Sequence, residues 1–151
     1  MSSLLSDELL SNIGRQTSPN RELVTRREIR KYAIATGNRQ ARYLRGDQAP
    51  PMFHVALFWD VVELDQLSPD GVSIDALLPK FPLEKAMAGG LHIEYLQPVY
   101  PGDWLTATRT LTDIYEKEGR SGPLIFYKVD MRIENDAGEA VILEETTRIL
   151  R

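Results

Sequence analysis

The stretch P-P-M-F-H-V-A-L-F-W-D-V-V-E-L, residues 50–64, is apolar at nearly every position after the two prolines. Pro51 suits the first position of a helix, where the missing N–H would have no intrahelical acceptor. A helix that is apolar on all sides is normally buried on most of them. A buried β-strand is the alternative, but a length beyond ten residues favours a helix. The run therefore predicts a long buried helix from Met52 to Leu64.

The part of the chain after this run has the patterns of antiparallel strands. In residues 125–134, every second position from Ile125 to Ile133 is apolar or aromatic, and the positions between them from Lys128 to Glu134 are charged, which predicts a strand with one buried face. Residues 104–115 are rich in threonine, which strands prefer. Asn135 to Gly138 predicts a turn between two strands. Four strands are expected, at residues 91–96, 104–115, 125–133 and 140–150, after an irregular segment at 65–90.

The N-terminal part predicts two helices. Leucine and isoleucine recur at helical spacing in residues 2–13, and a linker is expected at 15–23. Thr25 and Glu28 have the spacing of a capping box, in which each side chain satisfies a backbone N–H at the start of a helix. Gly37 suits the end of that helix, where a left-handed residue is needed.

This order of elements favours an α+β fold. The economical arrangement is one antiparallel β-sheet wrapped around the long central helix, because each supplies the apolar surface that the other lacks. With 151 residues the chain is expected to form a single domain, in which residues 1–23 are the N-terminal helix and linker.

Composition excludes several classes of function. The net charge of −4 argues against nucleic-acid binding, and the basic cluster at 26–31 is better explained as the solvated face of a helix. Because cysteine is absent, disulfide scaffolds, zinc fingers and thiol nucleophiles are excluded. The sequence has no glycine-rich phosphate motif and no metal-ligand spacing, so neither a cofactor nor a metal is expected. With no signal-peptide pattern and no apolar run of membrane-spanning length, the expected location is cytoplasmic.

Several blocks of sequence resemble the hot-dog fold of MaoC-like acyl-thioester hydratases and dehydratases, and in particular their N-terminal, non-catalytic type. The blocks are V-T-R-R-E-I-R-K-Y-A-I-A-T-G at 24–37, A-P-P-M-F at 49–53, E-Y-L-Q-P-V-Y-P-G-D-W-L-T-A at 94–107 and D-I-Y-E-K-E-G-R-S-G-P-L-I-F at 113–126. The resemblance implies a hot-dog fold with a long central helix. It also implies a ligand that is an acyl-CoA or another acyl-carrier thioester.

The same resemblance implies that the catalytic pair is degenerate in this chain. The family signature is G-D-x-N-P-x-H, in which the Asp and the His hold the reacting water. Gly37 matches the first glycine, but Asn38 stands at the Asp position and Tyr43 at the His position. An amide cannot accept a proton near neutral pH, and a phenol with a pKa near 10 is a poor substitute for imidazole. Pro51 also lacks an N–H that could stabilise an oxyanion. We therefore expect no catalytic residue in this chain.

Five residues are candidates for substrate binding. Phe53 and Trp59 are core residues by default, together with Met52 and Phe58, but residues of this helix could line an acyl channel. Arg120 could contact pantetheine or nucleotide phosphates, or it could be a solvated hairpin tip. His54 and His92 have structural use as their default, although either could form a site with Glu94 or Asp60.

The function that the resemblance implies is that of a hot-dog subunit of an enoyl-thioester (acyl-CoA) hydratase/dehydratase, which shapes the acyl channel for a catalytic MaoC-like subunit. The alternatives are a self-sufficient enoyl-CoA hydratase with a non-standard acid–base pair, a hot-dog thioesterase and an acyl-thioester binding protein. A homo- or hetero-oligomer is expected, because an isolated hot-dog sheet leaves unpaired edges and exposed apolar surface.

Overall fold

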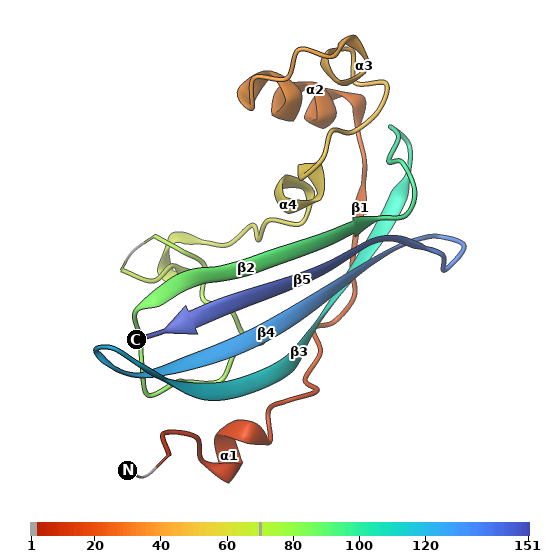
Figure 1. Cartoon of the computed structure of the whole chain (residues 1–151). Helices are drawn as coiled ribbons and strands as arrows, with labels where there is room; N and C mark the ends of the chain where they lie inside the picture. The colour runs from red at the N-terminus through yellow and green to blue at the C-terminus, as the bar shows by residue number, and fades with distance from the viewer. Residues whose placement is uncertain (1–2, 70) are drawn as a thin grey trace.

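The computed structural model, which describes residues 3–69 and 71–151, contains one antiparallel sheet of five strands (Figure 1). The strand order is β1-β3-β4-β5-β2. The bounds are β1 (Asn20–Leu23), β2 (Ala86–Tyr95), β3 (Trp104–Gly119), β4 (Gly122–Asn135) and β5 (Ala140–Leu150). The helices are few and short and lie outside the sheet. An antiparallel sheet with separate helices is an α+β fold, so the class predicted from the sequence is confirmed.

The strand patterns in the sequence correspond closely to β3, β4 and β5. In β4 the apolar positions Ile125, Val129 and Ile133 are buried, and the charged positions between them face the opposite side. The turn into β5 is closed by Asn135, whose side-chain oxygen accepts hydrogen bonds from the backbone N–H groups of Ala137 and Glu139, both at 3.0 Å. This turn fixes the register of β4 against β5.

The capped helix is confirmed as α2 (Arg26–Ala35). The Thr25 hydroxyl oxygen accepts a hydrogen bond from the backbone N–H of Glu28 at 3.2 Å and donates to the Glu28 carboxylate at 2.8 Å. Gly37 follows with φ of +72°, the left-handed conformation expected after a helix end. A single helical turn, α3 (Ala41–Leu44), comes next.

The N-terminal prediction was only partly right. Within the helix predicted at 2–13, only α1 (Asp7–Leu10) is helical, and Ser2 lies outside the described residues. Residues 15–23 are not a plain linker, because β1 pairs with β3 at the edge of the sheet. The backbone hydrogen bonds that these four residues form with β3 stabilise a strand, although the composition of the segment is typical of a loop.

The prediction of a long central helix was wrong. The helix is α4 (Phe53–Leu57), five residues, and the chain then runs irregularly to a short 3-10 turn, η1 (Leu64–Gln66). The side chains of Trp59 and Val61 are 65% and 101% exposed. A helix that is apolar on all sides must be covered by other apolar residues on every side. The one five-stranded sheet of this chain can cover only one side. Aromatic and β-branched residues also have weak helix propensity, so nothing local keeps residues 58–64 helical.

β2 begins earlier than the sequence indicated. Residues 86–90, expected to be irregular, belong to this strand, which accommodates Gly89 through a register shift against β5. Because β2 is the last strand in the order, its outer edge has no strand partner within the described part of the chain. Most of its side chains are exposed.

The core has two parts. One lies under α2 and α4 and contains Val24, Ile29, Phe53, Val99, Leu105, Ala107, Ile133, Val141 and Ile142. The other contains Leu9, Leu77, Leu111, Ile114, Ile125, Tyr127, Val129 and Leu150. Figure 1 shows α2, α3 and α4 grouped together and α1 apart from them, so the two parts are covered by different segments. In the described residues we find no helix with the length and apolar character needed to span a membrane.

Candidate functional site

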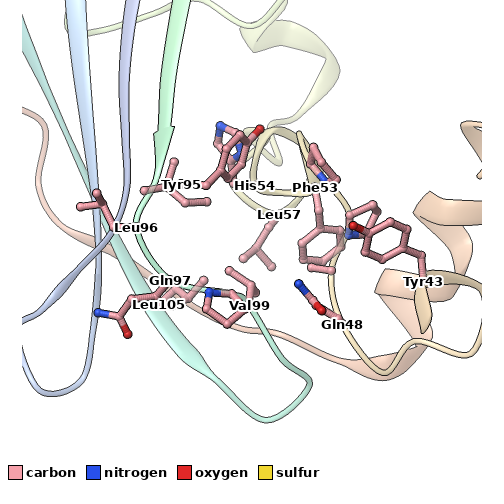
Figure 2. Close-up of a pocket in the computed structure, with 15 residues that line it drawn as sticks. Tyr43, Gln48, Phe53, His54, Leu57, Tyr95, Leu96, Gln97, Val99 and Leu105 are labelled. Atoms are coloured by element: carbon pink, nitrogen blue, oxygen red, sulfur yellow. The ribbon is translucent and has the colours of Figure 1, made fainter. Parts of the chain in front are cut away.

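A cavity of about 340 Å³ lies where the segment at 43–57 meets the ends of β2, β3 and β5 (Figure 2). Its volume is near the lower end of the range for small-ligand sites, about 300–1,000 Å³. Apolar residues form most of the wall, namely Ala49, Pro50, Pro51, Phe53, Leu57, Leu96, Pro98, Val99, Leu105 and Ile142. The more polar residues in the wall are Tyr43, Gln48, His54, Tyr95 and Gln97. Such a cavity suits a mainly hydrocarbon ligand that a few polar groups orient.

Met52 joins the start of α4 to the end of β2. Its φ of +67° is unusual for a residue with a side chain, and no other non-glycine residue in the described chain has a positive φ. Its backbone N–H donates a hydrogen bond to the Tyr95 hydroxyl at 3.0 Å. Because Tyr95 is the last residue of β2, this bond holds the helix against the strand at the cavity. Strained backbone of this kind concentrates at functional sites.

His54 of α4 and Glu144 of β5 form a buried pair beside the cavity. Nε2 of His54 lies 2.6 Å from Oε2 of Glu144, and the two side chains are 2% and 10% exposed. The Thr146 hydroxyl donates to the other carboxylate oxygen at 3.1 Å. The hydrogen bond from His54 is the main cause that holds the pKa of Glu144 below its usual range, against the opposing effect of burial. Glu144 is therefore a carboxylate, and Nε2 of His54 carries the shared proton.

The other ring nitrogen of His54 has no internal partner. Nδ1 is buried and accepts or donates no hydrogen bond within the described residues. The ring of Tyr95 packs against the imidazole in an edge-on contact, with ring centroids 6.3 Å apart (Figure 2). An imidazole whose second nitrogen is held by a carboxylate can serve as a general acid or base, and it can also orient a ligand.

The two degenerate pair positions are in different surroundings. Among the described residues that line the cavity, Tyr43 is present and Asn38 is not. Tyr43 is 6% exposed, and its hydroxyl accepts a hydrogen bond from Arg42 at 3.0 Å. The Asn38 side-chain amide donates to the Thr36 hydroxyl at 3.0 Å, next to the end of α2.

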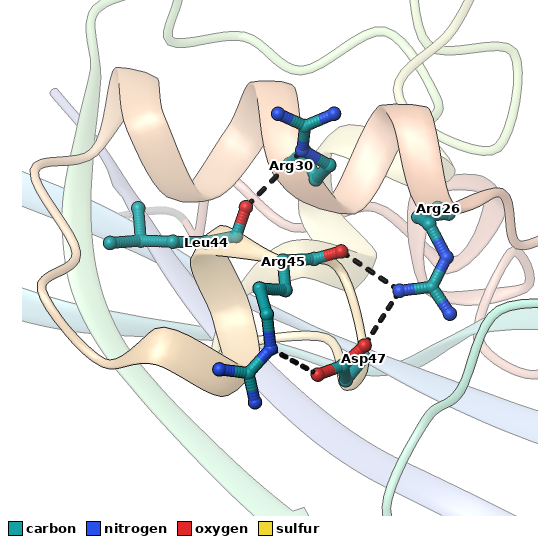
Figure 3. A network of polar contacts seen from close by, with 5 residues as sticks. All are labelled: Arg26, Arg30, Leu44, Arg45 and Asp47. Atoms are coloured by element: carbon teal, nitrogen blue, oxygen red, sulfur yellow. Dashed lines mark hydrogen bonds and ion pairs between the residues drawn. The ribbon is translucent and has the colours of Figure 1, made fainter.

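A polar network fixes α3, and with it Tyr43, against α2 (Figure 3). Arg26 donates to the Asp47 carboxylate at 2.6 Å and to the backbone oxygen of Arg45 at 2.8 Å. Arg45 donates to the other Asp47 oxygen at 2.8 Å. These two hydrogen bonds, first from Arg26 and then from Arg45, lower the pKa of Asp47. The basic cluster is thus solvent-exposed, as predicted, but Arg26 also has a structural role.

The structure brings together two of the five candidate binding residues. Phe53 and His54 line the cavity. Trp59 is 65% exposed, so the interpretation of its side chain as core was wrong. His92 lies on the exposed edge strand, 3.5 Å from Glu94, and Arg120 is exposed at the tip of the β3–β4 hairpin. A role in binding for these three stays a prediction.

Sequence reasoning missed Glu144. His54 and Glu144 are 90 positions apart, and nothing in the spacing joins them. One signal was present in β5, where Ile142 and Glu144 share a face of the strand. A carboxylate that follows a buried isoleucine on the same face indicates a buried charge that needs a partner.

Residues 11–144 match the family described as FAS1-like, dehydratase domain region. The chain belongs to this family. The resemblance to MaoC-like hot-dog proteins is thereby confirmed, and with it the place of the chain in a hydratase/dehydratase family. The assignment to the N-terminal, non-catalytic type stays a prediction.

Known proteins similar to this chain include a mesaconyl-C(4)-CoA hydratase from Chloroflexus aurantiacus, 30% identical over 102 residues. That match covers 67% of this chain but only 36% of the relative. Among solved structures, the ChsH1-ChsH2 complex from Mycobacterium tuberculosis matches with a TM-score of 0.73 at 16% identity, over 95% of this chain and 89% of that chain. R-hydratase PhaJ1 from Pseudomonas aeruginosa matches with a TM-score of 0.61 at 18% identity, over 91% and 81%. At these identities the structures establish the fold alone, which is the hot-dog fold.

Proposed function

We propose that this chain is a subunit of an enoyl-thioester hydratase or dehydratase that holds the acyl group while a catalytic MaoC-like partner transfers the protons. One observation carries the proposal. Tyr43 stands in the wall of an apolar cavity, at the position where the family has histidine. The cavity can bind a hydrocarbon chain, but the degenerate pair positions cannot transfer protons.

The chemistry of hydration explains why a partner is needed. Water adds across the C2=C3 bond of an enoyl thioester, and a base must accept a proton from that water. The Asn38 amide has no such capacity near neutral pH, and the phenol at position 43 is a poor substitute for the imidazole of the family. The Tyr43 hydroxyl already accepts a hydrogen bond from Arg42. Tyr43, in the cavity wall, therefore supports a role in binding.

Exposed surface supports the proposed partner. The outer edge of β2 is unpaired in the described chain, and residues 58–64 expose large apolar side chains. Soluble proteins normally cover such edges and patches. A similar chain occurs in the ChsH1-ChsH2 complex, which is an assembly of two different subunits. We propose that the catalytic subunit covers this surface.

The test is reconstitution. We would purify the chain alone and together with a MaoC-like chain that has the intact G-D-x-N-P-x-H segment, and follow the loss of enoyl-thioester absorbance with crotonyl-CoA. The expected result is negligible hydration by the chain alone and clear hydration by the complex. A complex in which the partner's signature Asp is replaced by Asn is the matched control and should be inactive.

The same assay distinguishes the rival functions. A self-sufficient hydratase would need its own acid–base pair, and His54 with Glu144 is the imidazole–carboxylate pair beside the cavity. Robust hydration by the chain alone, lost in Glu144→Gln, would refute our proposal in favour of that function. Release of free thiol without hydration would identify a thioesterase instead. Binding without turnover in any combination would indicate an acyl-thioester binding protein.

A further inference from the structure

Residues 26–47, which contain α2 and α3, include seven arginines and lysines but only two acidic residues. The chain as a whole has a net charge of −4, so positive charge is concentrated in this segment. All seven basic residues are exposed. Figure 1 shows α2 and α3 side by side at one end of the molecule. This end therefore has a positive surface on a protein that is acidic overall.

The stability of α2 does not account for this charge. Arg26 and Arg27 occupy the first turn of the helix, where the macrodipole disfavours cations. Arg26 lies four positions before Arg30, and Arg27 lies four positions before Lys31, a spacing at which like charges repel each other on a helix. Positive charge that lowers the stability of its own helix indicates a use in binding an anion.

Four of the arginines are held in place by hydrogen bonds to residues 40–47, and Figure 3 shows three of them. We call these four the arginine cluster: Arg26, Arg30, Arg42 and Arg45. Arg30 donates through Nε alone, to the backbone oxygen of Leu44 at 3.3 Å, and Arg45 donates through Nε alone, to Asp47 at 2.8 Å. The terminal nitrogens of both side chains therefore have no acceptor within the described residues. A guanidinium that is already oriented and keeps free donors suits the bidentate recognition of a phosphate.

The arginine cluster begins at the wall of the cavity. The Arg42 guanidinium lies over the ring of Tyr43, 4.7 Å from the ring centroid, and donates to the Tyr43 hydroxyl at 3.0 Å. Tyr43 lines the cavity, and so does Gln48, which follows Asp47 in the chain. An acyl group bound in the cavity would thus have a positive surface next to it, where a negatively charged carrier can lie.

We infer that the arginine cluster binds the phosphates of coenzyme A, so that the substrate is an acyl-CoA. The inference rests on the proposed function, because it takes the cavity as the site of the acyl group. Beyond its pantetheine arm, coenzyme A carries a pyrophosphate and a ribose phosphate. Six of the seven basic residues in 26–47 are arginines, which pair with phosphate through two parallel N–H bonds, whereas lysine acts as a point charge. An acyl carrier protein, the other common carrier, presents a single phosphate on its pantetheine arm.

The first experiment compares two ligands that differ only in the phosphorylated nucleotide. Calorimetry with the wild-type chain would use hexanoyl-CoA and hexanoyl-pantetheine, which share the acyl group and the pantetheine arm. We expect hexanoyl-CoA to bind at least about tenfold more tightly in about 50 mM salt, as charge-assisted hydrogen bonds to phosphate allow. The ratio should fall as the salt concentration rises, because exposed charges are screened. Equal affinities at low salt would refute the inference.

The second experiment removes two guanidiniums but keeps the pair between Arg26 and Asp47 that fixes α3. The double variant Arg30→Gln, Arg45→Gln should reduce the preference for hexanoyl-CoA to below about threefold. Its affinity for hexanoyl-pantetheine should stay within about twofold of wild type, which shows that the cavity is intact. A preference that survives the double variant would refute the inference. The wild-type comparison needs no variant, so it decides the matter even if the double variant does not fold.

Two controls test where the phosphates bind. The variant Lys80→Gln, Lys85→Gln makes the same change in net charge at two exposed residues outside α2 and α3, and it should keep the preference. An equal loss in this control would mean that only the total charge of the chain matters, and the inference would fail. Loss of the preference in Arg120→Gln alone would place the phosphates at the tip of the β3–β4 hairpin, which also contradicts the arginine cluster as the site.

The remaining outcomes separate the carrier from the proposed function. If hexanoyl-loaded acyl carrier protein binds through the arginine cluster and hexanoyl-CoA binds no better than hexanoyl-pantetheine, the surface recognises a carrier protein and the inference is wrong. If the reconstituted complex hydrates crotonyl-CoA and crotonyl-pantetheine with equal KM, the inference fails and the proposed function stands. If the arginine cluster confers the preference for hexanoyl-CoA but no partner restores hydration, the phosphate site stands and the proposed function fails.

Discussion

Removal of the Glu144 carboxylate should strongly destabilise the fold, because it leaves His54 buried with neither nitrogen paired. The exposed fractions are 2% for His54 and 10% for Glu144, so water cannot replace the lost bond without rearrangement. A buried donor that loses its partner costs about 1–3 kcal/mol. In a chain of this length that corresponds to a fall of roughly 2–12 °C in melting temperature. Urea unfolding and a thermal melt of Glu144→Ala would measure both.

The neighbouring glutamate provides a matched control. Glu145 is on the opposite face of β5, its side chain is 45% exposed, and it pairs with Lys128 at 3.1 Å. Exposed pairs contribute little, so Glu145→Ala should lower the free energy of unfolding by less than about a quarter of the Glu144→Ala effect. Equal effects of the two alanine variants would refute the reasoning, since burial of the pair would then not determine its contribution.

Four further results are expected. The pKa of Glu144 is lowered in the folded state. Its contribution to stability is therefore present above the ordinary pKa of 4.5 and is lost as the pH falls through the lowered pKa. The difference in unfolding free energy between wild type and Glu144→Gln, measured by urea titrations in a pH series, should shrink in acid. Phe53→Ala should lower the free energy of unfolding by about 3–5 kcal/mol. Trp59→Ala, at a side chain 65% exposed, should lower it by under about 1 kcal/mol in the isolated chain. Similar values for the two variants in denaturant titrations would contradict the short-helix structure. Gly46→Ala should lower the melting temperature of the chain, because its φ is +73° and a Cβ would lie 2.7 Å from the backbone oxygen of Arg26; an unchanged melt would contradict this. Asn38→Ala should leave hydration by the reconstituted complex within about tenfold of wild type; a loss of 10³-fold, about 4 kcal/mol in the barrier, would make Asn38 catalytic.

The strands and the capped helix could be predicted because their signals are local. Alternation from Ile125 to Ile133 indicates one buried face whatever lies against it, and Asn135 closes the next turn with its own side chain. Thr25 and Glu28 likewise cap α2 within four residues. The start of β2 was missed because residues 86–90 become a strand only by pairing with residues 147–150 of β5, about 60 positions later in the chain.

The site was less accessible to sequence reasoning. The degenerate positions could be placed by resemblance, but the position of Tyr43 in the cavity wall could not, since it depends on how α3 is fixed by Arg26 and Asp47. To predict the pairing of His54 with Glu144, one must know the register of β5 and the position of α4, and the spacing of residues in the sequence indicates neither. Glu94 and Asp60 are the acidic residues nearer to His54 in sequence, so they were the predicted partners. In the fold, the partner is the acidic residue that is buried beside His54.

The wrong prediction at residues 52–64 and the proposed partner have the same physical origin. Apolar side chains indicate that a segment is buried, but they do not say by which chain. Phe53 is buried by this chain, whereas Trp59, Val61 and Leu64 are exposed. If the catalytic subunit covers these three residues, the apolar run is explained in full, and its second half belongs to the interface. Trp59→Ala, nearly neutral in the isolated chain, should then weaken the complex by about 2 kcal/mol or more, as buried tryptophans at interfaces do. An unchanged dissociation constant for the reconstituted pair would place the partner on another surface.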